Sequence, residues 1–118
     1  MAYASNNVFA KILRGEIPCN KVYEDEFALA FHDIAPDAPV HVLVIPKGNY
    51  MSFDDFAENS PPEFMKGYFS AVQKVAKKLN LQENGYRIIS NHGADASQSV
   101  PHFHVHILAG KNLGRLLP

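Results

Sequence analysis

The segment that decides the fold is Val100-Pro101-His102-Phe103-His104-Val105-His106-Ile107-Leu108-Ala109. Histidine alternates with apolar residues along it, which is the period of two expected for a β-strand with one buried face. We therefore predict a strand over residues 100–109, with its proline near the start, where a missing N–H is tolerated. The apolar side chains then point to a core, and the three histidines form a row on the opposite face.

The rest of the chain supplies partners for this strand. A short helix is predicted over 8–13, capped by Asn6 or Asn7 and stopped at Gly15. A long helix follows Ser60-Pro61-Pro62-Glu63, which has the spacing of a capping box. Its apolar stripe consists of Phe64, Tyr68, Val72, Val75 and Leu79. Further strands are predicted at 22–24, 27–32, 40–45 and 86–90, with one helical turn starting at 52–55 and loops at 33–39 and 91–99. In the strand at 27–32, the residues expected to share one face are Phe27, Leu29 and Phe31.

The order of these elements is helix, three strands, long helix, two strands. Short connections between successive strands favour antiparallel pairing. We therefore predict an α+β fold, in which a five-stranded antiparallel sheet packs with one long and one short helix. The 118 residues are 47% hydrophobic and 19% charged, which predicts a single domain spanning 1–118.

Composition excludes several classes of function. The net charge of -1 provides no overall positive field for nucleic acid or an anionic membrane. Cys19 is the single cysteine, so neither an internal disulfide nor a cysteine-based metal cluster can form. No run approaches the roughly 20 apolar residues that span a bilayer, and the first six residues lack the features of a secretory signal. We expect a cytoplasmic protein that binds neither nucleic acid nor membranes.

The histidine row has three possible interpretations. It could be a solvated strand face, although such faces usually carry Thr, Lys or Glu. It could bind zinc, but the outer two histidines lie roughly 13 Å apart at Cα, so a third ligand would have to come from His41, His92 or Asp33. It could be catalytic, with the middle histidine attacking and its neighbours orienting it or moving protons.

The loop at 91–99 favours the catalytic interpretation. Its sequence, Asn91-His92-Gly93-Ala94-Asp95-Ala96-Ser97-Gln98-Ser99, is rich in small residues, hydroxyls and amides. Backbone N–H groups and side-chain donors of this kind can hold a phosphoryl oxygen. A histidine beside such a loop suggests the transfer of a phosphoryl-type group to imidazole.

Further segments accompany the alternating histidines in a fixed order. They are Val8-Phe9-Ala10-Lys11-Ile12, Gly15-Glu16-Ile17-Pro18, Ala30-Phe31-His32-Asp33-Ile34, His41-Val42-Leu43-Val44-Ile45-Pro46-Lys47 and Gln98-Ser99-Val100. With the triad, they resemble the histidine triad (HIT) family, and within it the Hint branch of purine nucleoside phosphoramidases. The resemblance extends from about residue 8 to 110, which marks the expected core of a single HIT domain.

The resemblance implies a role for each matching residue. His104 would be the nucleophile that takes the nucleoside monophosphate, and His102 would orient it. The other catalytic residues would be His106, His41 and Ser99. Nucleotide contacts would come from Asp33 at the ribose, from Ile34, Phe9 and Ile12 at the base, and from Asn91, Ser97 and Gln98 in the loop before the triad. His32 is expected to be structural rather than catalytic.

The resemblance also implies a reaction and an assembly. The expected activity is hydrolysis of purine nucleoside phosphoramidates or acyl-adenylates through a nucleotidyl-histidine intermediate, with an AMP-like or GMP-like ligand, no cofactor and no metal. Two copies would form a homodimer in which two five-stranded sheets join into one. Dinucleoside polyphosphate hydrolysis, as in the Fhit branch, remains an alternative, as does a nucleotide-binding module with little turnover.

Four features depart from the family pattern. Pro101 precedes the triad where many Hint members have an aromatic or aliphatic residue. Ser97 stands where a glycine is usual, and its Cβ could crowd the approach of phosphate. The chain ends without the tryptophan-bearing tail of the eukaryotic proteins, which leaves the leaving group open. It also lacks the Cys-x-x-Cys of zinc-binding members.

Overall fold

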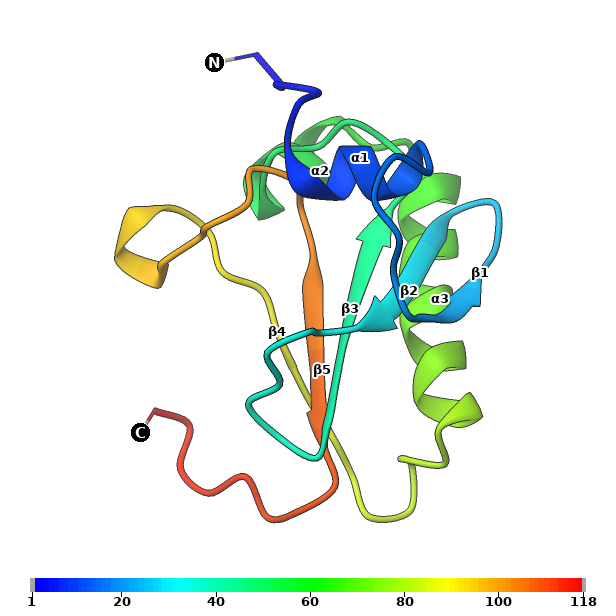
Figure 1. The fold of residues 1–118 in the computed structure, drawn as a ribbon, viewed down its shortest axis with the longest axis vertical. Coiled ribbons are helices and arrows are strands. Elements are labelled where there is room, and N and C mark those ends of the chain that lie inside the picture. Colours follow the sequence, from blue (N-terminus) through cyan, green and yellow to red (C-terminus); the bar gives the residue numbers. More distant parts are fainter. Residues whose placement is uncertain (1, 118) are drawn as a thin grey trace.

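The computed structural model describes residues 2–117; Met1 and Pro118, the ends of the predicted domain, lie outside the described residues. In chain order its elements are α1 (Val8–Leu13), β1 (Lys21–Glu24), β2 (Ala28–His32), β3 (Val40–Pro46), α2 (Phe53–Asn59), α3 (Pro62–Lys78), β4 (Arg87–Ile89), the 3₁₀ turn η1 (Ala94–Ala96) and β5 (Val105–Ala109). Figure 1 shows the strands at the centre, with α3 running alongside them and α1 near one end.

The predicted α+β fold with a five-stranded antiparallel sheet is confirmed. The strands lie in the order β1-β2-β3-β5-β4, and every neighbouring pair is antiparallel. The pairing of β3 with β5 places Leu43 opposite His106 and His41 opposite Leu108. The last strand of the chain therefore inserts beside the third and completes the centre of the sheet.

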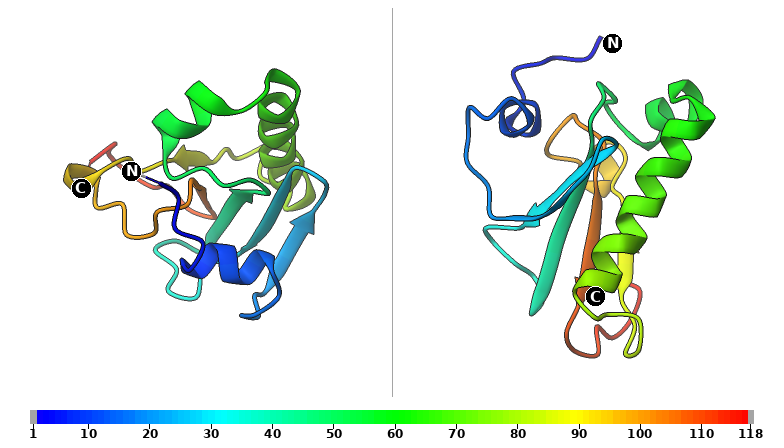
Figure 2. Two further views of the ribbon diagram at one scale, coloured as in Figure 1. Left: turned by 90° about the horizontal axis from the view of Figure 1, so that it is seen from above. Right: turned by 90° about the vertical axis from the view of Figure 1, so that its right-hand side faces the viewer.

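The two faces of the sheet are covered differently. Figure 2 shows α3 along one face and α1 on the other. The α3 face carries the main core, in which Tyr68, Val72 and Val75 pack on sheet residues. The Tyr68 hydroxyl, which is fully buried, donates to the Val44 carbonyl oxygen at 2.7 Å and so avoids an unpaired polar group. The second core, beneath α1, is smaller and consists of Phe9, Leu29, Phe31, Leu43 and Ile45.

Local sequence signals explain α1 and the apolar face of α3. Asn7 is the N-cap of α1, because its side-chain oxygen accepts the Ala10 N–H at 2.9 Å. Gly15 follows the helix with φ 78°, a left-handed conformation that favours glycine. The stripe predicted for α3 is also confirmed, with Tyr68, Val72 and Val75 buried and its end residues packed against the core.

The predicted capping box before α3 is wrong. Pro61, rather than Ser60, is the N-cap residue, and no side chain caps this helix end. The Ser60 hydroxyl is buried and has no hydrogen-bond partner among residues 2–117. The two prolines shift the start of the helix one residue along, because proline fixes φ and is well suited to the first helical position.

Three other predictions need correction. Residues 100–104 do not join the ladder, because β5 begins at Val105, so His102 and His104 precede the strand. Phe27 does not share the face of Leu29; its ring packs edge-on against Phe64 of α3. The turn predicted at 52–55 is the seven-residue helix α2, so the fold has two short helices besides the long one.

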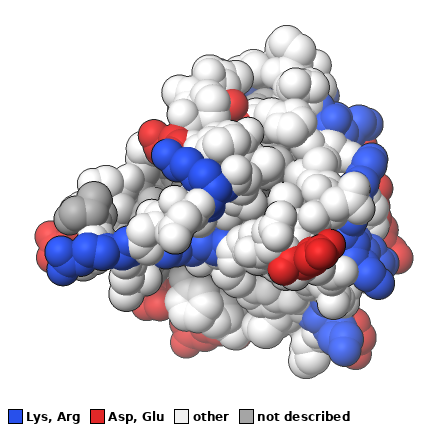
Figure 3. Space-filling view, turned by 90° about the horizontal axis from the view of Figure 1, so that it is seen from below, with Lys and Arg blue, Asp and Glu red and all other residues white. Residues whose placement is uncertain are grey.

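The surface agrees with the balanced composition. Figure 3 shows acidic and basic side chains interspersed with uncharged residues on the face that it presents. Among residues 2–117, no helix has both the length and the apolar character needed to cross a membrane.

The Ser60 environment predicts an unusual mutational result. Ser60→Ala should leave the free energy of unfolding unchanged or raise it by up to about 1 kcal/mol, because it removes a buried hydroxyl without a partner. Urea denaturation would measure this. The matched control is Asn7→Ala, which removes a working cap and should cost about 1 kcal/mol. A comparable loss in Ser60→Ala would show that its hydroxyl does cap α3.

Candidate active site

Four histidines gather on the α1 face of the sheet. His41 lies on β3 and His106 on β5, and their register makes them diagonal neighbours across the strand pair. His102 and His104 lie in the extended segment just before β5, with the same alternation as the strand. His102 is 0% exposed and His104 only 6% exposed, so the triad is a partly sheltered site and not a solvated face.

The His104 ring is held in one tautomer. Its Nδ1 lies 2.8 Å from the carbonyl oxygen of His102, and a carbonyl can only accept. The proton of neutral His104 is therefore on Nδ1, and Nε2 keeps its lone pair. Nε2 has no hydrogen-bond partner among residues 2–117. The Phe9 ring packs against the His104 ring in a T-shaped arrangement, with the two centroids 4.9 Å apart. The Ser90 hydroxyl holds the backbone of this residue, because it donates to the His104 carbonyl at 3.0 Å.

His41 links the triad to the loop after β2. The backbone N–H of Asp37 donates to His41 Nδ1 at 3.0 Å, so the proton of neutral His41 is on Nε2. That Nε2–H donates to Nδ1 of His106 at 2.9 Å, with a carboxylate oxygen of Asp33 at 3.4 Å. Nδ1 of His106 is therefore an acceptor, and the proton of neutral His106 is on Nε2. This N–H donor belongs to a ring that lies beside the His104 ring, with the two ring centroids 5.1 Å apart.

The same hydrogen bonds bear on the zinc interpretation. Among residues 2–117, one group has metal-ligand spacing: Asp33, His41 and His106, whose candidate atoms all lie within 4.8 Å of one another. Neutral His41 could bind a cation through Nε2 only by moving its proton to Nδ1, which already faces the Asp37 N–H. This arrangement disfavours the ion, and the absence of a bound metal stays a prediction. His92 lies elsewhere, exposed and 3.7 Å from Asp54.

Burial keeps the triad neutral. Desolvation lowers the pKa of His102 from 6.5 to about 4, against the opposing effect of its hydrogen bond to the Pro46 carbonyl. Desolvation, reinforced by the nearby His104 and His41 rings, lowers the pKa of His106 to about 4. The pKa of His104 is also lowered, mainly by burial. At neutral pH the nucleophile candidate therefore holds an unprotonated nitrogen.

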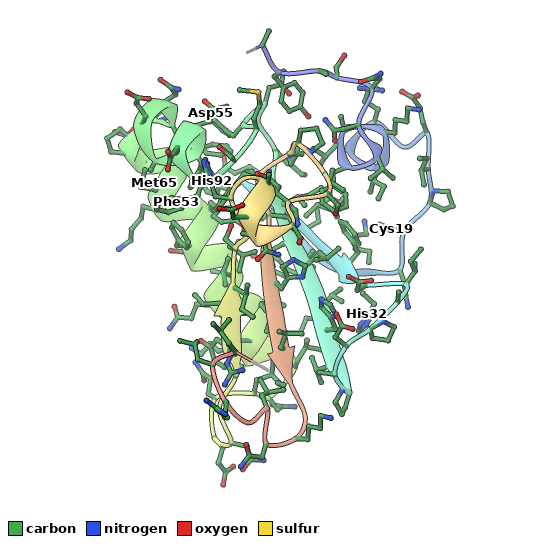
Figure 4. All side chains as sticks on the ribbon, turned by 90° about the vertical axis from the view of Figure 1, so that its left-hand side faces the viewer. Cys19, His32, Phe53, Asp55, Met65 and His92 are labelled. Carbon is green, nitrogen blue, oxygen red and sulfur yellow. The ribbon has the colours of Figure 1, made fainter. Side chains whose placement is uncertain are left out.

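The 91–99 loop is tied to the segment before α2. The Gln98 side-chain amide donates to the carbonyls of Met51 and Val100, and its oxygen accepts the N–H of Gly93 at 3.0 Å. In Figure 4, His92 lies close to Phe53 and Asp55, where this loop meets α2.

Ser97 has φ 58° and ψ 41°, a left-handed conformation. This explains why a glycine would be favoured at this position.

The predicted nucleotide-binding residues occupy several environments. Phe9 is buried against His104, and Ile12 is half-buried on the second core. Ile34 is 100% exposed in the loop after β2, whereas Asp33 is half-buried beside His41. In the loop before the triad, Asn91 is half-buried, and Ser97 and Ser99 are exposed. Contacts of all these residues with a nucleotide stay predictions. His32, expected to be structural, is exposed at the end of β2.

Sequence reasoning missed three residues around the triad. The Tyr3 hydroxyl lies 2.6 Å from His102 Nδ1, and the Asn7 side-chain amide donates to that hydroxyl at 3.0 Å. Ser90 holds the His104 carbonyl. No local pattern marks the contacts of Tyr3 with His102 and of Ser90 with His104, because each joins residues that are distant in the sequence. Only the capping role of Asn7 was visible in the sequence.

The lowered histidine pKa values predict how stability depends on pH. Between pH 6.5 and about 4 the unfolded chain binds more protons than the folded one. The free energy of unfolding is therefore highest above pH 6.5 with respect to these groups and falls as the pH drops towards 4. In His106→Asn the loss of unfolding free energy over this pH range should be smaller than in the wild type by about 1–2 kcal/mol. This figure includes a reduction for solvent screening around the half-buried ring. Urea denaturation across this range, with exposed His32→Asn as the control, would measure it. Equal slopes in both variants would contradict the assignment.

The left-handed conformation of Ser97 predicts a stabilising substitution. Ser97→Gly should raise the free energy of unfolding by about 0.5–1 kcal/mol. The relief of backbone strain in the folded protein should outweigh the extra conformational entropy that glycine gives the unfolded chain. Ser70→Gly, in the helical conformation of α3, is the matched control and should lose about 0.5 kcal/mol. Thermal denaturation would compare the two, and a loss in both would show that Ser97 is not strained.

Comparison with known proteins agrees with this geometry. A 13.2 kDa HIT-like protein of Azospirillum brasilense is 56% identical over 115 residues, which cover 98% of this chain and 94% of that protein. A HIT family hydrolase from Clostridium thermocellum is 40% identical, with a TM-score of 0.88 over 98% of this chain and 99% of that one. A histidine triad nucleotide-binding protein from Candida albicans is 35% identical, with a TM-score of 0.77 over 86% of this chain and 73% of that one.

The sequence model of the HIT domain family matches residues 14–113, which include β1 to β5 and all the histidines described above. The alternating histidines, the sheet that carries them and the matched region agree, and the chain belongs to the HIT domain family.

Proposed function

We propose that this protein hydrolyses purine nucleoside phosphoramidates or acyl-adenylates through a nucleotidyl-His104 intermediate. One observation carries the proposal: the His104 ring donates from Nδ1 to a backbone carbonyl and so presents an unprotonated Nε2. Relatives described as a hydrolase and as a nucleotide-binding protein share the fold. Both descriptions fit a nucleophile that acts on a nucleotide.

The first step transfers the nucleotidyl group to the protein. His104 Nε2 attacks the α-phosphorus of the phosphoramidate, the P–N bond of the substrate breaks, and the amine leaves with the electron pair of that bond. Protonation of the substrate nitrogen beforehand lets the amine depart neutral. The imidazole, now bonded to phosphorus at Nε2, carries positive charge. Its Nδ1–H remains bonded to the His102 carbonyl, which stabilises that charge in a largely desolvated site.

The second step regenerates the histidine. Water attacks the same phosphorus, the bond from phosphorus to His104 breaks, and the nucleoside monophosphate leaves while one proton passes to solvent. The Nε2–H of His106 is placed to donate to a phosphoryl oxygen beside the His104 ring. His41 supports this role, because its own Nε2–H occupies Nδ1 of His106 and so keeps the donor on the other nitrogen.

The rest of the nucleotide would contact the flanks of the site. We assign the base to the side of Phe9, Ile12 and Ile34, the ribose to Asp33, and the phosphate to Asn91, Ser97, Gln98 and Ser99. Phe9 supports this placement, since it touches the His104 ring from the α1 side. Gln98 would act through the loop, because its amide already bonds within the protein.

The homodimer expected from the family resemblance is part of the proposal. β4 is an edge strand, and Ile88 on it is 51% exposed. Phe53 on α2 and Phe69 on α3 are also exposed. An unpaired strand edge and exposed apolar side chains suit a second copy of the chain, because pairing satisfies the edge and contact with another copy buries apolar surface.

The decisive test is release of AMP from adenosine 5′-phosphoramidate, with EDTA present. The wild type should turn over the substrate without metal, and His104→Ala should lose activity by at least about a thousandfold while still binding AMP. His32→Ala, which changes an exposed histidine, is the matched control and should retain full activity.

Other outcomes would assign a different function. AMP binding by the wild type without phosphoramidate turnover would contradict the proposal. Cleavage of a dinucleoside polyphosphate by that protein would then identify a polyphosphate hydrolase, and no cleavage of either substrate would identify a binding module. Activity abolished by EDTA would contradict the metal-free mechanism.

A further inference from the structure

The segment before α1 reaches the triad through a chain of hydrogen bonds that the proposed reaction does not use. Residues 2–13 lie outside the region matched by the family model, which begins at residue 14. Tyr3 from this segment nevertheless touches the most buried histidine of the site. Its hydroxyl is 2.6 Å from His102 Nδ1, and the two rings meet edge to face at a centroid separation of 5.6 Å.

The direction of this chain is set at the start of α1. The backbone N–H of Ala10 donates to the side-chain oxygen of Asn7 at 2.9 Å. The amide nitrogen of Asn7 must therefore be the other end of the group, where it donates to the Tyr3 hydroxyl oxygen at 3.0 Å and to the Ala4 carbonyl at 2.9 Å. Every polar atom of the Asn7 side chain is thus committed.

The end of β3 fixes the tautomer of His102. The Pro46 carbonyl can only accept, and it lies 3.0 Å from Nε2, so neutral His102 carries its proton on Nε2 and its Nδ1 is an acceptor. The Tyr3 hydroxyl, which accepts from Asn7, therefore donates its own proton to Nδ1. All donors point the same way, from the helix cap through Tyr3 and His102 to the end of β3. Hydrogen bonds aligned in this manner strengthen one another.

His102 in turn places the nucleophile. Its side chain is anchored at both ring nitrogens, and its backbone carbonyl is the acceptor for His104 Nδ1–H at 2.8 Å. An Nδ1 left without a donor in a fully buried ring would be an unsatisfied polar atom, which favours a displacement of the whole residue. Such a displacement would move the His102 carbonyl and with it the direction of His104 Nε2.

We propose that Tyr3 is a positioning residue of the triad, whose hydroxyl satisfies Nδ1 of the buried His102 and holds that residue in the place from which its carbonyl orients His104 for attack. The catalytic part of this inference rests on the phosphoramidase activity proposed above. The competing explanation is that Tyr3 only anchors the segment before α1 by packing. In that case the aromatic ring matters and the hydroxyl does not.

Tyr3→Phe separates these explanations, because it keeps the ring and removes only the hydroxyl. ¹⁵N NMR of histidine-labelled protein at pH 7 should show the His102 Nδ1 resonance moved downfield, because this nitrogen loses its donor, while Nε2 stays protonated at Pro46. The His104 Nδ1 resonance should move as well, because the His102 carbonyl to which it donates is displaced. The kcat for adenosine 5′-phosphoramidate should fall about fivefold, as expected for one lost hydrogen bond, while KM changes by less than about twofold.

Two further variants sharpen the test. Asn7→Asp keeps an oxygen for the Ala10 N–H but replaces the donor to Tyr3 by an acceptor. The Tyr3 proton should then turn to the new carboxylate, so His102 Nδ1 loses its donor and both resonances should move as in Tyr3→Phe. Tyr23→Phe, on β1, is the matched control, because it also removes one hydroxyl, which donates to the Asp25 carboxylate at 2.9 Å. Both the His102 spectrum and kcat of this variant should match the wild type.

The outcomes are distinct. An unchanged His104 Nδ1 resonance in Tyr3→Phe would overturn the proposal, whatever the activity. A moved His104 resonance with unchanged kcat would also overturn it, because His102 would then not orient the nucleophile. If the wild type releases no AMP, the proposed function fails, and the NMR measurement on its own decides whether Tyr3 positions His102 and His104.

Discussion

The antiparallel pairing of β3 with β5 is the constraint on which the rest of this structure depends. It joins the last strand of the chain to the third and fixes which side chains meet across the centre of the sheet. Val42, Val44 and Ile107 then face the core beneath α3, and His41 and His106 face the α1 side. A slip of one residue would exchange the two faces. The main core and the candidate active site are thus specified by the same register.

On the face that carries the candidate active site, hydrogen-bond partners in fixed directions offset the free-energy cost of burying the imidazole rings. The rings of His41, His102 and His104 each bond to a backbone group, and His106 accepts from His41. Backbone carbonyls and N–H groups have a fixed direction, so they decide which ring nitrogen holds the proton. Desolvation disfavours the charged form. The combination leaves neutral rings in defined tautomers, which a nucleophile requires and which an exposed strand face would not provide.

Segments that are far apart in the sequence surround this site. Phe9 of α1 packs against both His102 and His104, and Tyr3 bonds to His102 from the preceding segment. The 91–99 loop is tied down by Gln98, which bonds to the carbonyl of Met51 before α2. The geometry of the candidate active site therefore depends on tertiary contacts that lie outside the histidine motif itself.

The sequence by itself determined the element order, the antiparallel sheet and the identity of the histidines, because these depend on local periodicity and on residue chemistry. It determined the cap of α1 at Asn7 but mispredicted the box at Ser60, where two prolines move the helix start. Only the tertiary structure decided the start of β5, the helical extent of α2 and the side of Phe27, since these depend on packing against α3 and on ladder pairing. It alone also decided the tautomers and the contact of Tyr3 with His102. A hydrogen bond between residues 3 and 102 joins groups that become neighbours only when the chain folds, so no local pattern in the sequence records it.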